Sequence, residues 1–148
     1  MTRRFLAGLL WLLACAVAGA LPDSPKVVNG SVRVTQPQTH ILQVLQSSPQ
    51  AILNWNSFGI GPSEVVRFLQ PNTQAVLLNR VIGSDPSQIL GRLTSNGTIF
   101  LINPNLVQAP ETALRALVNQ GTIRVSPAGY VVLVSPLLQN QDSGVILG

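Results

Sequence analysis

The sequence predicts an all-β protein, a parallel β-helix (solenoid) in which short strands stack coil upon coil. Short apolar runs alternate with Asn, Gly, Pro and Ser turns, a pattern typical of many short strands. Charged residues make up only 9% of the chain, whereas disordered segments combine high charge with low hydrophobicity. A third observation is an internal repeat: Asn96-Gly97-Thr98-Ile99 returns as Asn119-Gln120-Gly121-Thr122-Ile123, and more loosely as Gln141 to Ile146.

The spacing of this repeat indicates the solenoid. Gly97, Gly121 and Gly144 lie 24 and then 23 residues apart, and a period in the twenties built from strands and tight turns is typical of stacked repeats. Asn96, Asn119 and Asn140 would then form hydrogen-bonded ladders along the stack. A β-sandwich is the structural alternative.

Residues 1–20 are interpreted as a signal peptide that precedes a domain over 21–148. Arg3 and Arg4 begin it, an uncharged apolar run follows from Phe5 to Val17, and Ala18-Gly19-Ala20 offers small residues before cleavage after Ala20. The run is shorter than the ~20 residues that a membrane-spanning helix needs. The alternatives are an uncleaved anchor and a lipoprotein signal with its recognition box at Leu12-Leu13-Ala14-Cys15.

The strands that follow are predicted from their β-branched apolar residues and flanking turns. One segment differs: Ala109 to Val118 begins with proline and glutamate and has apolar residues at helical spacing, so a short helix is expected near 110–118. The expected strands are Ser31–Val34, His40–Leu45, Ala51–Asn54, Glu64–Leu69, Ala75–Leu78, Ile89–Leu93, Thr98–Ile102, Thr122–Val125 and Tyr130–Val134.

Charge and cysteine content exclude several functions. Without Arg3 and Arg4, seven basic residues face five acidic ones, a net charge of +2 with no cluster along the chain, so no nucleic-acid partner is expected. Cys15 is the only cysteine, and its loss with the signal peptide leaves no thiol for a metal site or a disulfide.

Nothing in the sequence predicts an enzyme. The acidic residues are isolated in the sequence. No two of them are separated by the 23 or 24 residues of the repeat, and the closest to this spacing are Glu64 and Asp85, 21 residues apart. Polysaccharide-cleaving sites need paired carboxylates. His40 is the only histidine, and no Gly-x-Ser-x-Gly elbow accompanies it. We therefore expect no catalytic residue, no cofactor, no metal and no small-molecule substrate.

Four sequence segments resemble one family. They are NWNSFGIG from Asn54, VRFLQPNTQAVLLNRV from Val66, DPSQILGRLTSNGTIFLINPN from Asp85, and VNQGTIRVSPAGYVVLVSPLLQNQDSGVIL from Val118. In their residues and in their order they resemble the amino-terminal secretion domain, or haemagglutination-activity domain, of filamentous-haemagglutinin-type exoproteins. These exoproteins leave Gram-negative cells by two-partner secretion.

The resemblance implies a right-handed parallel β-helix that serves as a secretion address. Its implied partner is an outer-membrane β-barrel transporter with periplasmic docking domains, reached after export through the inner membrane, and the protein would end secreted or on the cell surface. Asn103, Pro104 and Asn105, with Asn54 and Trp55, are the candidate recognition residues. The physics of Asn103-Pro104-Asn105 favours a turn over direct contact, and Trp55 is expected to fill the interior of the column.

The sequence departs from the family after Asn105, where Leu106 to Pro110 replaces the family's continuation. The following block resembles coils that lie much further on in family members. We therefore interpret the domain as internally shortened after about residue 105 and expect a poor secretion substrate. The alternatives are a remnant without transport activity and an adhesin fragment that binds glycans or a host or neighbouring cell surface.

Overall fold

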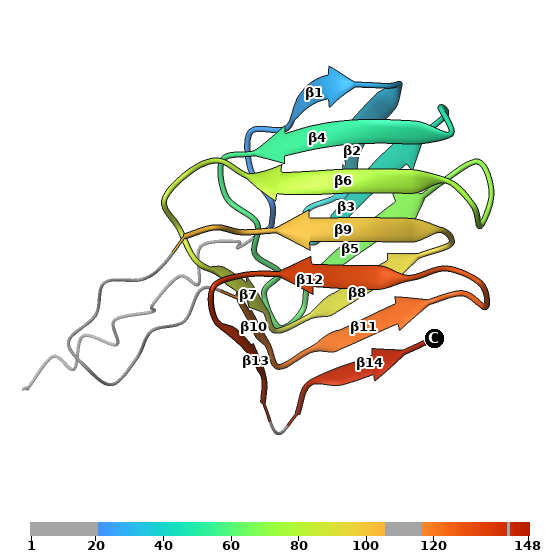
Figure 1. Ribbon diagram of the computed structural model, residues 1–148. Coiled ribbons are helices and arrows are strands. Elements are labelled where there is room, and N and C mark those ends of the chain that lie inside the picture. Colours follow the sequence, from blue (N-terminus) through green and yellow to red (C-terminus); the bar gives the residue numbers. More distant parts are fainter. Residues whose placement is uncertain (1–20, 106–116, 142) are drawn as a thin grey trace, which may run out of the picture.

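The computed structural model describes residues 21–105, 117–141 and 143–148 (Figure 1). The expected signal peptide, with Ala18 and Ala20, lies outside the described residues, as do residues 109–116 of the expected helix. The last two residues of that expectation, Leu117 and Val118, are the start of a strand instead. No helix among the described residues is long and apolar enough to cross a membrane.

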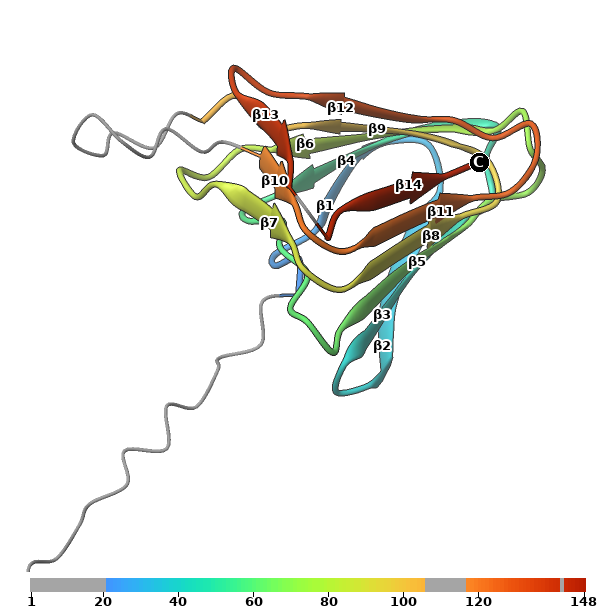
Figure 2. The same cartoon turned by 90° about the horizontal axis from the view of Figure 1, so that it is seen from below.

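The described residues form fourteen β-strands in three sheets. These sheets are the sides of a solenoid (Figures 1 and 2). The five-stranded sheet contains β1 (Lys26–Asn29), β4 (Gln50–Trp55), β6 (Val76–Val81), β9 (Thr98–Ile102) and β12 (Val131–Val134). The three-stranded sheet contains β7 (Ser87–Ile89), β10 (Leu117–Asn119) and β13 (Leu138–Asn140). The six-stranded sheet contains β2 (Val32–Gln38), β3 (Ile41–Gln46), β5 (Val65–Leu69), β8 (Arg92–Ser95), β11 (Thr122–Val125) and β14 (Val145–Leu147).

From β3 onward, all neighbouring strands pair in parallel. The complete coils run from the three-stranded sheet through the six-stranded sheet to the five-stranded sheet, as β7, β8 and β9 do and as β10, β11 and β12 do again. In the six-stranded sheet β8 pairs with β5 on one side and with β11 on the other. The predicted all-β parallel β-helix is therefore confirmed, and the β-sandwich alternative is wrong.

Alternation along each strand builds the core. In the six-stranded sheet Val66, Leu93 and Ile123 stand side by side in register and have no exposed surface. The same happens across the interior in the five-stranded sheet, where Leu77 lies beside Ile99. Because a strand alternates its side chains with period two, each coil contributes its inward residues to one apolar column, and the outward residues stay at the surface.

The two ends of the column differ. At the beginning, β1 pairs antiparallel with β4, and β2 pairs antiparallel with β3, so both long sheets start with an antiparallel strand. At the other end, β12, β13 and β14 are the last strands of their sheets. There the inward-facing Ile146 is 53% exposed, although its neighbour in the stack, Ile123, is fully buried. The first coil is thus capped by backbone pairing, and the last described coil leaves apolar side chains uncovered.

The repeat that predicted the solenoid combines residues from two different corners of the coil. Gly121 stands against Gly91 of the preceding coil, not against Gly97, since Thr122 pairs with Arg92. Gly97 lies instead at the corner between β8 and β9. Both corners are tight turns, which explains the similar residues, and residues 106–116 fall between Gly91 and Gly121. The second half of the repeat is correct, because Thr122 pairs with Val145 of the next coil.

The predicted asparagine ladder is accordingly confirmed for Asn119 and Asn140 and wrong for Asn96. Asn119 donates its Nδ2 to the Oδ1 of Asn140 at 2.7 Å. Asn96 belongs to another corner, where its Oδ1 accepts from the backbone N of Gln70 at 2.7 Å and its Nδ2 donates to the Gln70 carbonyl at 2.8 Å.

Most predicted strands lie within a few residues of those observed, and Thr98–Ile102 and Thr122–Val125 coincide with β9 and β11. The prediction of one strand over Ile89–Leu93 is wrong, because the chain turns at Leu90 and Gly91 between β7 and β8. The two sequence blocks on either side of residues 106–116 also stack in continuous register, with Leu117 beside Ser87 and Thr122 beside Arg92.

Candidate functional site

The side chain of Asn103 is buried and holds a corner of the solenoid. It follows directly after β9 and has no exposed surface. Its Nδ2 donates to the carbonyl of Asp85 at 3.0 Å and to the Oγ of Ser87 at 2.9 Å. Its Oδ1 accepts from the backbone N of Asn105 at 3.0 Å. The amide therefore ties the end of β9 to the segment that leads into β7 of the same coil.

The next two residues complete the turn. Pro104 is exposed, while Asn105 is half-buried and donates its Nδ2 to the carbonyl of Gly83. The bond from Asn105 N to Asn103 Oδ1 is the local side-chain-to-backbone contact that asparagine makes in turns. The segment thus forms an Asx-type turn through this one side-chain bond, which agrees with its residue types, while the backbone of the described residues 103–105 makes no hydrogen-bonded turn. Of the three side chains, Pro104 is therefore the most exposed and Asn103 the least.

Trp55 lies inside the column at the end of β4. It has no exposed surface, its Nε1 donates to the Oδ1 of Asn79 at 3.0 Å, and its ring meets that of Phe58 edge to face at 5.7 Å. A polar partner for a buried indole N–H is the usual arrangement. The expectation that Trp55 fills the interior is confirmed, so the folded domain does not present this ring to a partner.

Asn54 lies on the outer side of the five-stranded sheet, because its strand neighbours Leu53 and Trp55 point inward. Its Oδ1 accepts from the Nε of Arg80, the residue directly beside it on β6, at 3.0 Å. The five candidate residues therefore do not form one cluster: Asn103, Pro104 and Asn105 make a single turn, Trp55 is in the core, and Asn54 is on a sheet face.

A polar ladder inside another corner was not foreseen from the sequence. Gln70 is 6% exposed, and its Nε2 donates to Gln46 Oε1 and to the Ala75 carbonyl, both at 3.0 Å. Its Oε1 accepts from Ser95 Oγ at 2.8 Å. Gln46, Gln70 and Ser95 thus link three successive coils where the six-stranded sheet turns into the five-stranded sheet. The signal in the sequence that could have predicted this ladder is a glutamine or serine at the last inward position near the end of each strand.

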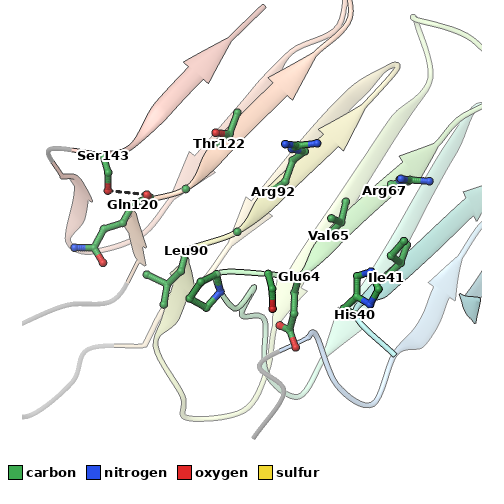
Figure 3. Close-up of a pocket in the computed structure, with 14 residues that line it drawn as sticks. His40, Ile41, Glu64, Val65, Arg67, Leu90, Arg92, Gln120, Thr122 and Ser143 are labelled. Atoms are coloured by element: carbon green, nitrogen blue, oxygen red, sulfur yellow. Dashed lines mark hydrogen bonds between the residues drawn. The ribbon is translucent and has the colours of Figure 1, made fainter. Parts of the chain in front are cut away.

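An open groove of about 570 Å³ runs along the beginnings of the strands of the six-stranded sheet (Figure 3). His40 and Arg67 lie toward one end, Arg92 near the middle, and Gln120 and Ser143 toward the other end. The Ser143 Oγ donates to the Gln120 carbonyl at 2.8 Å.

Glu64 also lines this groove. It is only 7% exposed, and its Oε2 accepts from the backbone N of Gly61 at 2.7 Å. The carboxylate is thereby used to hold the turn that leads into β5.

Comparison with known proteins agrees with this architecture. A family model described as the TPS (two-partner secretion) secretion domain matches residues 18–107. Among solved structures, the crystal structure of the HMW1 secretion domain from Haemophilus influenzae is 31% identical, with a TM-score of 0.65 over 84% of this chain. The match spans 41% of that longer chain. No curated protein matches the sequence.

The family match covers more than half of the chain, and its region contains the antiparallel cap, the first parallel coils and the Asn103 turn. The fold, the order of the sequence segments and the family match thus agree that the chain belongs to the TPS secretion domain family.

Proposed function

We propose that this chain acts as the secretion-targeting domain of an exoprotein and is recognised by an outer-membrane β-barrel transporter through periplasmic docking domains. The observation that carries the proposal is the family match over residues 18–107 together with the likeness to the HMW1 secretion domain. Secretion domains of this family are targeting domains, which agrees with the isolated acidic residues that the sequence offers.

We infer that capture uses strand pairing. An extended segment can add a strand to an open sheet edge, with main-chain hydrogen bonds supplying affinity. In the folded domain the edge at the beginning of both long sheets is occupied by β1 and β2. Capture by strand pairing therefore acts either on strands of a chain that is still extended or on the outer edges of the terminal strands, which are β1, β2 and β7 at the beginning of the sheets and β12, β13 and β14 at the other end. A signal peptide over residues 1–20 would deliver the chain to the periplasm, where this meeting takes place.

The role proposed for Asn103-Pro104-Asn105 is to fix the shape that the transporter recognises. The burial of Asn103 and its three hydrogen bonds support this role over direct contact. Asn54 and Trp55 would contribute in the same indirect way, through the sheet face and the column that they stabilise.

The proposal is tested by measuring binding of the purified protein to the isolated periplasmic domains of a family transporter. Binding is expected, and it should weaken in Asn103→Ala in proportion to the loss of stability of that variant. The matched control is Pro104→Ala, which removes an exposed ring and should bind as the unaltered protein does. Absence of binding to every family transporter tested would contradict the proposed function. Loss of binding in an Asn103→Ala/Asn105→Ala variant of unaltered thermal stability would contradict the indirect role and favour direct contact.

A further inference from the structure

The coil register gathers arginines that are scattered along the sequence. Arg33, Arg67, Arg92 and Arg124 are all exposed, and they belong to β2, β5, β8 and β11 of the six-stranded sheet. The sequence alone shows no basic cluster, because these residues are at least 25 positions apart. Their inward neighbours, such as Val66, Leu93 and Ile123, are buried in the core, so by strand alternation the four guanidinium groups emerge from one outer face.

On this face, Arg67 and Arg124 stand in one row with Thr94 between them. Arg92 stands in the next row, beside Thr122. Neighbouring strands lie ~4.8 Å apart, so Arg67 and Arg124 begin from backbone positions ~10 Å apart. The strands β5, β8 and β11 therefore carry one arginine each on this face, divided between two neighbouring rows.

Two concave regions follow these arginines. A hollow of about 320 Å³ is lined by Arg92, Thr94, Thr122, Arg124 and Leu147. It shares Arg92 and Thr122 with the larger groove of Figure 3. Two guanidinium groups and two threonine hydroxyls thus border one depression. Guanidinium groups bind sulfate and carboxylate oxygens with paired N–H donors, and hydroxyls add donors for the remaining oxygens.

Negative charge is absent from the strands of this face. None of β2, β3, β5, β8, β11 and β14 contains an aspartate or glutamate. The nearest carboxylate in the groove is Glu64, which precedes β5 and points to the backbone N of Gly61. It lines the larger groove but not the hollow between Arg92 and Arg124.

We propose that this arginine face binds a linear anionic polysaccharide laid along the solenoid axis, with a sulfate or carboxylate group seated between Arg92 and Arg124. A repeating polymer fits better than a single small anion, because the charges repeat from coil to coil. A polysaccharide fits better than a nucleic acid, because single-stranded nucleic acids are held by aromatic side chains that stack on the bases. The only aromatic residue in the six strands, Phe68, is buried on the inner side.

The test is binding of the purified protein to dextran sulfate and to polygalacturonate, with neutral dextran as the uncharged control. Binding to a charged polymer is expected, and it should weaken as salt is raised, since exposed charges are screened over ~10 Å at 0.1 M ionic strength. Arg92→Gln/Arg124→Gln should weaken binding at least tenfold. The matched control is Arg80→Gln, because Arg80 lies on the five-stranded sheet and donates to Asn54.

Thermal melting of each variant checks that it is folded, and Arg67→Gln provides a second variant on the same face if the double variant melts early. The proposal is overturned if no charged polysaccharide binds, or if Arg80→Gln weakens binding as much as the double variant. It is also overturned if single-stranded DNA or anionic lipid vesicles bind more tightly than either charged polysaccharide. These readouts do not involve a transporter, so they are independent of the secretion role proposed above.

Discussion

Replacing Asn103 by alanine should lower the free energy of unfolding of the solenoid more than replacing its neighbour Pro104 does. The asparagine side chain has no exposed surface and makes three hydrogen bonds, two as donor and one as acceptor. Alanine would leave the Asp85 carbonyl and the Ser87 hydroxyl without this donor inside the protein. Each net hydrogen bond is worth about 1 kcal/mol, and an abandoned buried polar group costs about 1–3 kcal/mol. We therefore expect a loss of about 3 kcal/mol in the free energy of unfolding.

Urea denaturation followed by circular dichroism measures this loss. With a slope of about 1–3 kcal/mol per molar urea for a small domain, the midpoint should fall by about 1–3 M while the slope stays unchanged. Asn105→Ala removes one side-chain bond, to the Gly83 carbonyl, and should cost about 1 kcal/mol. Pro104→Ala, at an exposed position, should change stability by less than about 0.5 kcal/mol. A midpoint for Asn103→Ala equal to that of Pro104→Ala would refute the assignment of Asn103 as the buried tie of this corner.

Three further predictions follow from the stacking. Gly121→Ala should lower the melting temperature sharply, because its Cβ would lie 2.0 Å from the carbonyl oxygen of Gly91, whereas Gly148→Ala, with nothing within 4 Å, should not; equal melting would contradict the coil contact. Gln70→Leu should lower the free energy of unfolding by about 2–4 kcal/mol, because Gln46, Ala75 and Ser95 would lose their hydrogen bonds to Gln70. Urea denaturation measures this loss, and the control is Gln43→Leu, a change at a half-buried position on the outer face. Co-expressed with a family transporter, a polypeptide of these 148 residues should reach the medium less efficiently than a longer family domain, because the inward-facing Ile146 of the last described coil is 53% exposed; equal export would show that this exposed apolar surface is no obstacle.

Strands were predictable from the sequence where they are long enough to show alternation. Thr98–Ile102 and Thr122–Val125 have inward apolar residues at every second position, and both were placed correctly. The strands of the three-stranded sheet have only three residues each, too few to reveal a period of two. The repeat of Asn and Gly identified a solenoid and the alignment of Gly121 with Gly144, but it aligned Gly97 with the wrong corner, because unrelated corners use the same turn residues.

The candidate site divides in the same way. A turn at Asn103-Pro104-Asn105 follows from local chemistry and was expected. The partners of Asn103 at Asp85 and Ser87 lie earlier in the same coil, and no local pattern indicates them. The arginine face was invisible in the sequence for a related reason: the spacing of Arg67, Arg92 and Arg124 is irregular, and only the strand pairing makes them neighbours.

The difference between the two ends of the column gives its assembly a direction. β4 pairs with the antiparallel strand β1, and β3 pairs with β2, so the first coil can pair its backbone with residues that precede it in the chain. Each later coil pairs with the coil before it, as β5 does with β3, β8 with β5 and β11 with β8. In such a stack the stability of one coil depends on its neighbours, so a finished coil is the template for the next.

If a chain emerges from a pore with its amino-terminal end first, each coil emerges after the coil on which it stacks. The same chain emerging in the opposite direction would expose β14, β13 and β12 first, none of which has its partner until β11, β10 and β9 follow. Under the secretion role proposed above, the fold would favour export with the amino-terminal end first, because folding at the far side would hold each coil that has already passed.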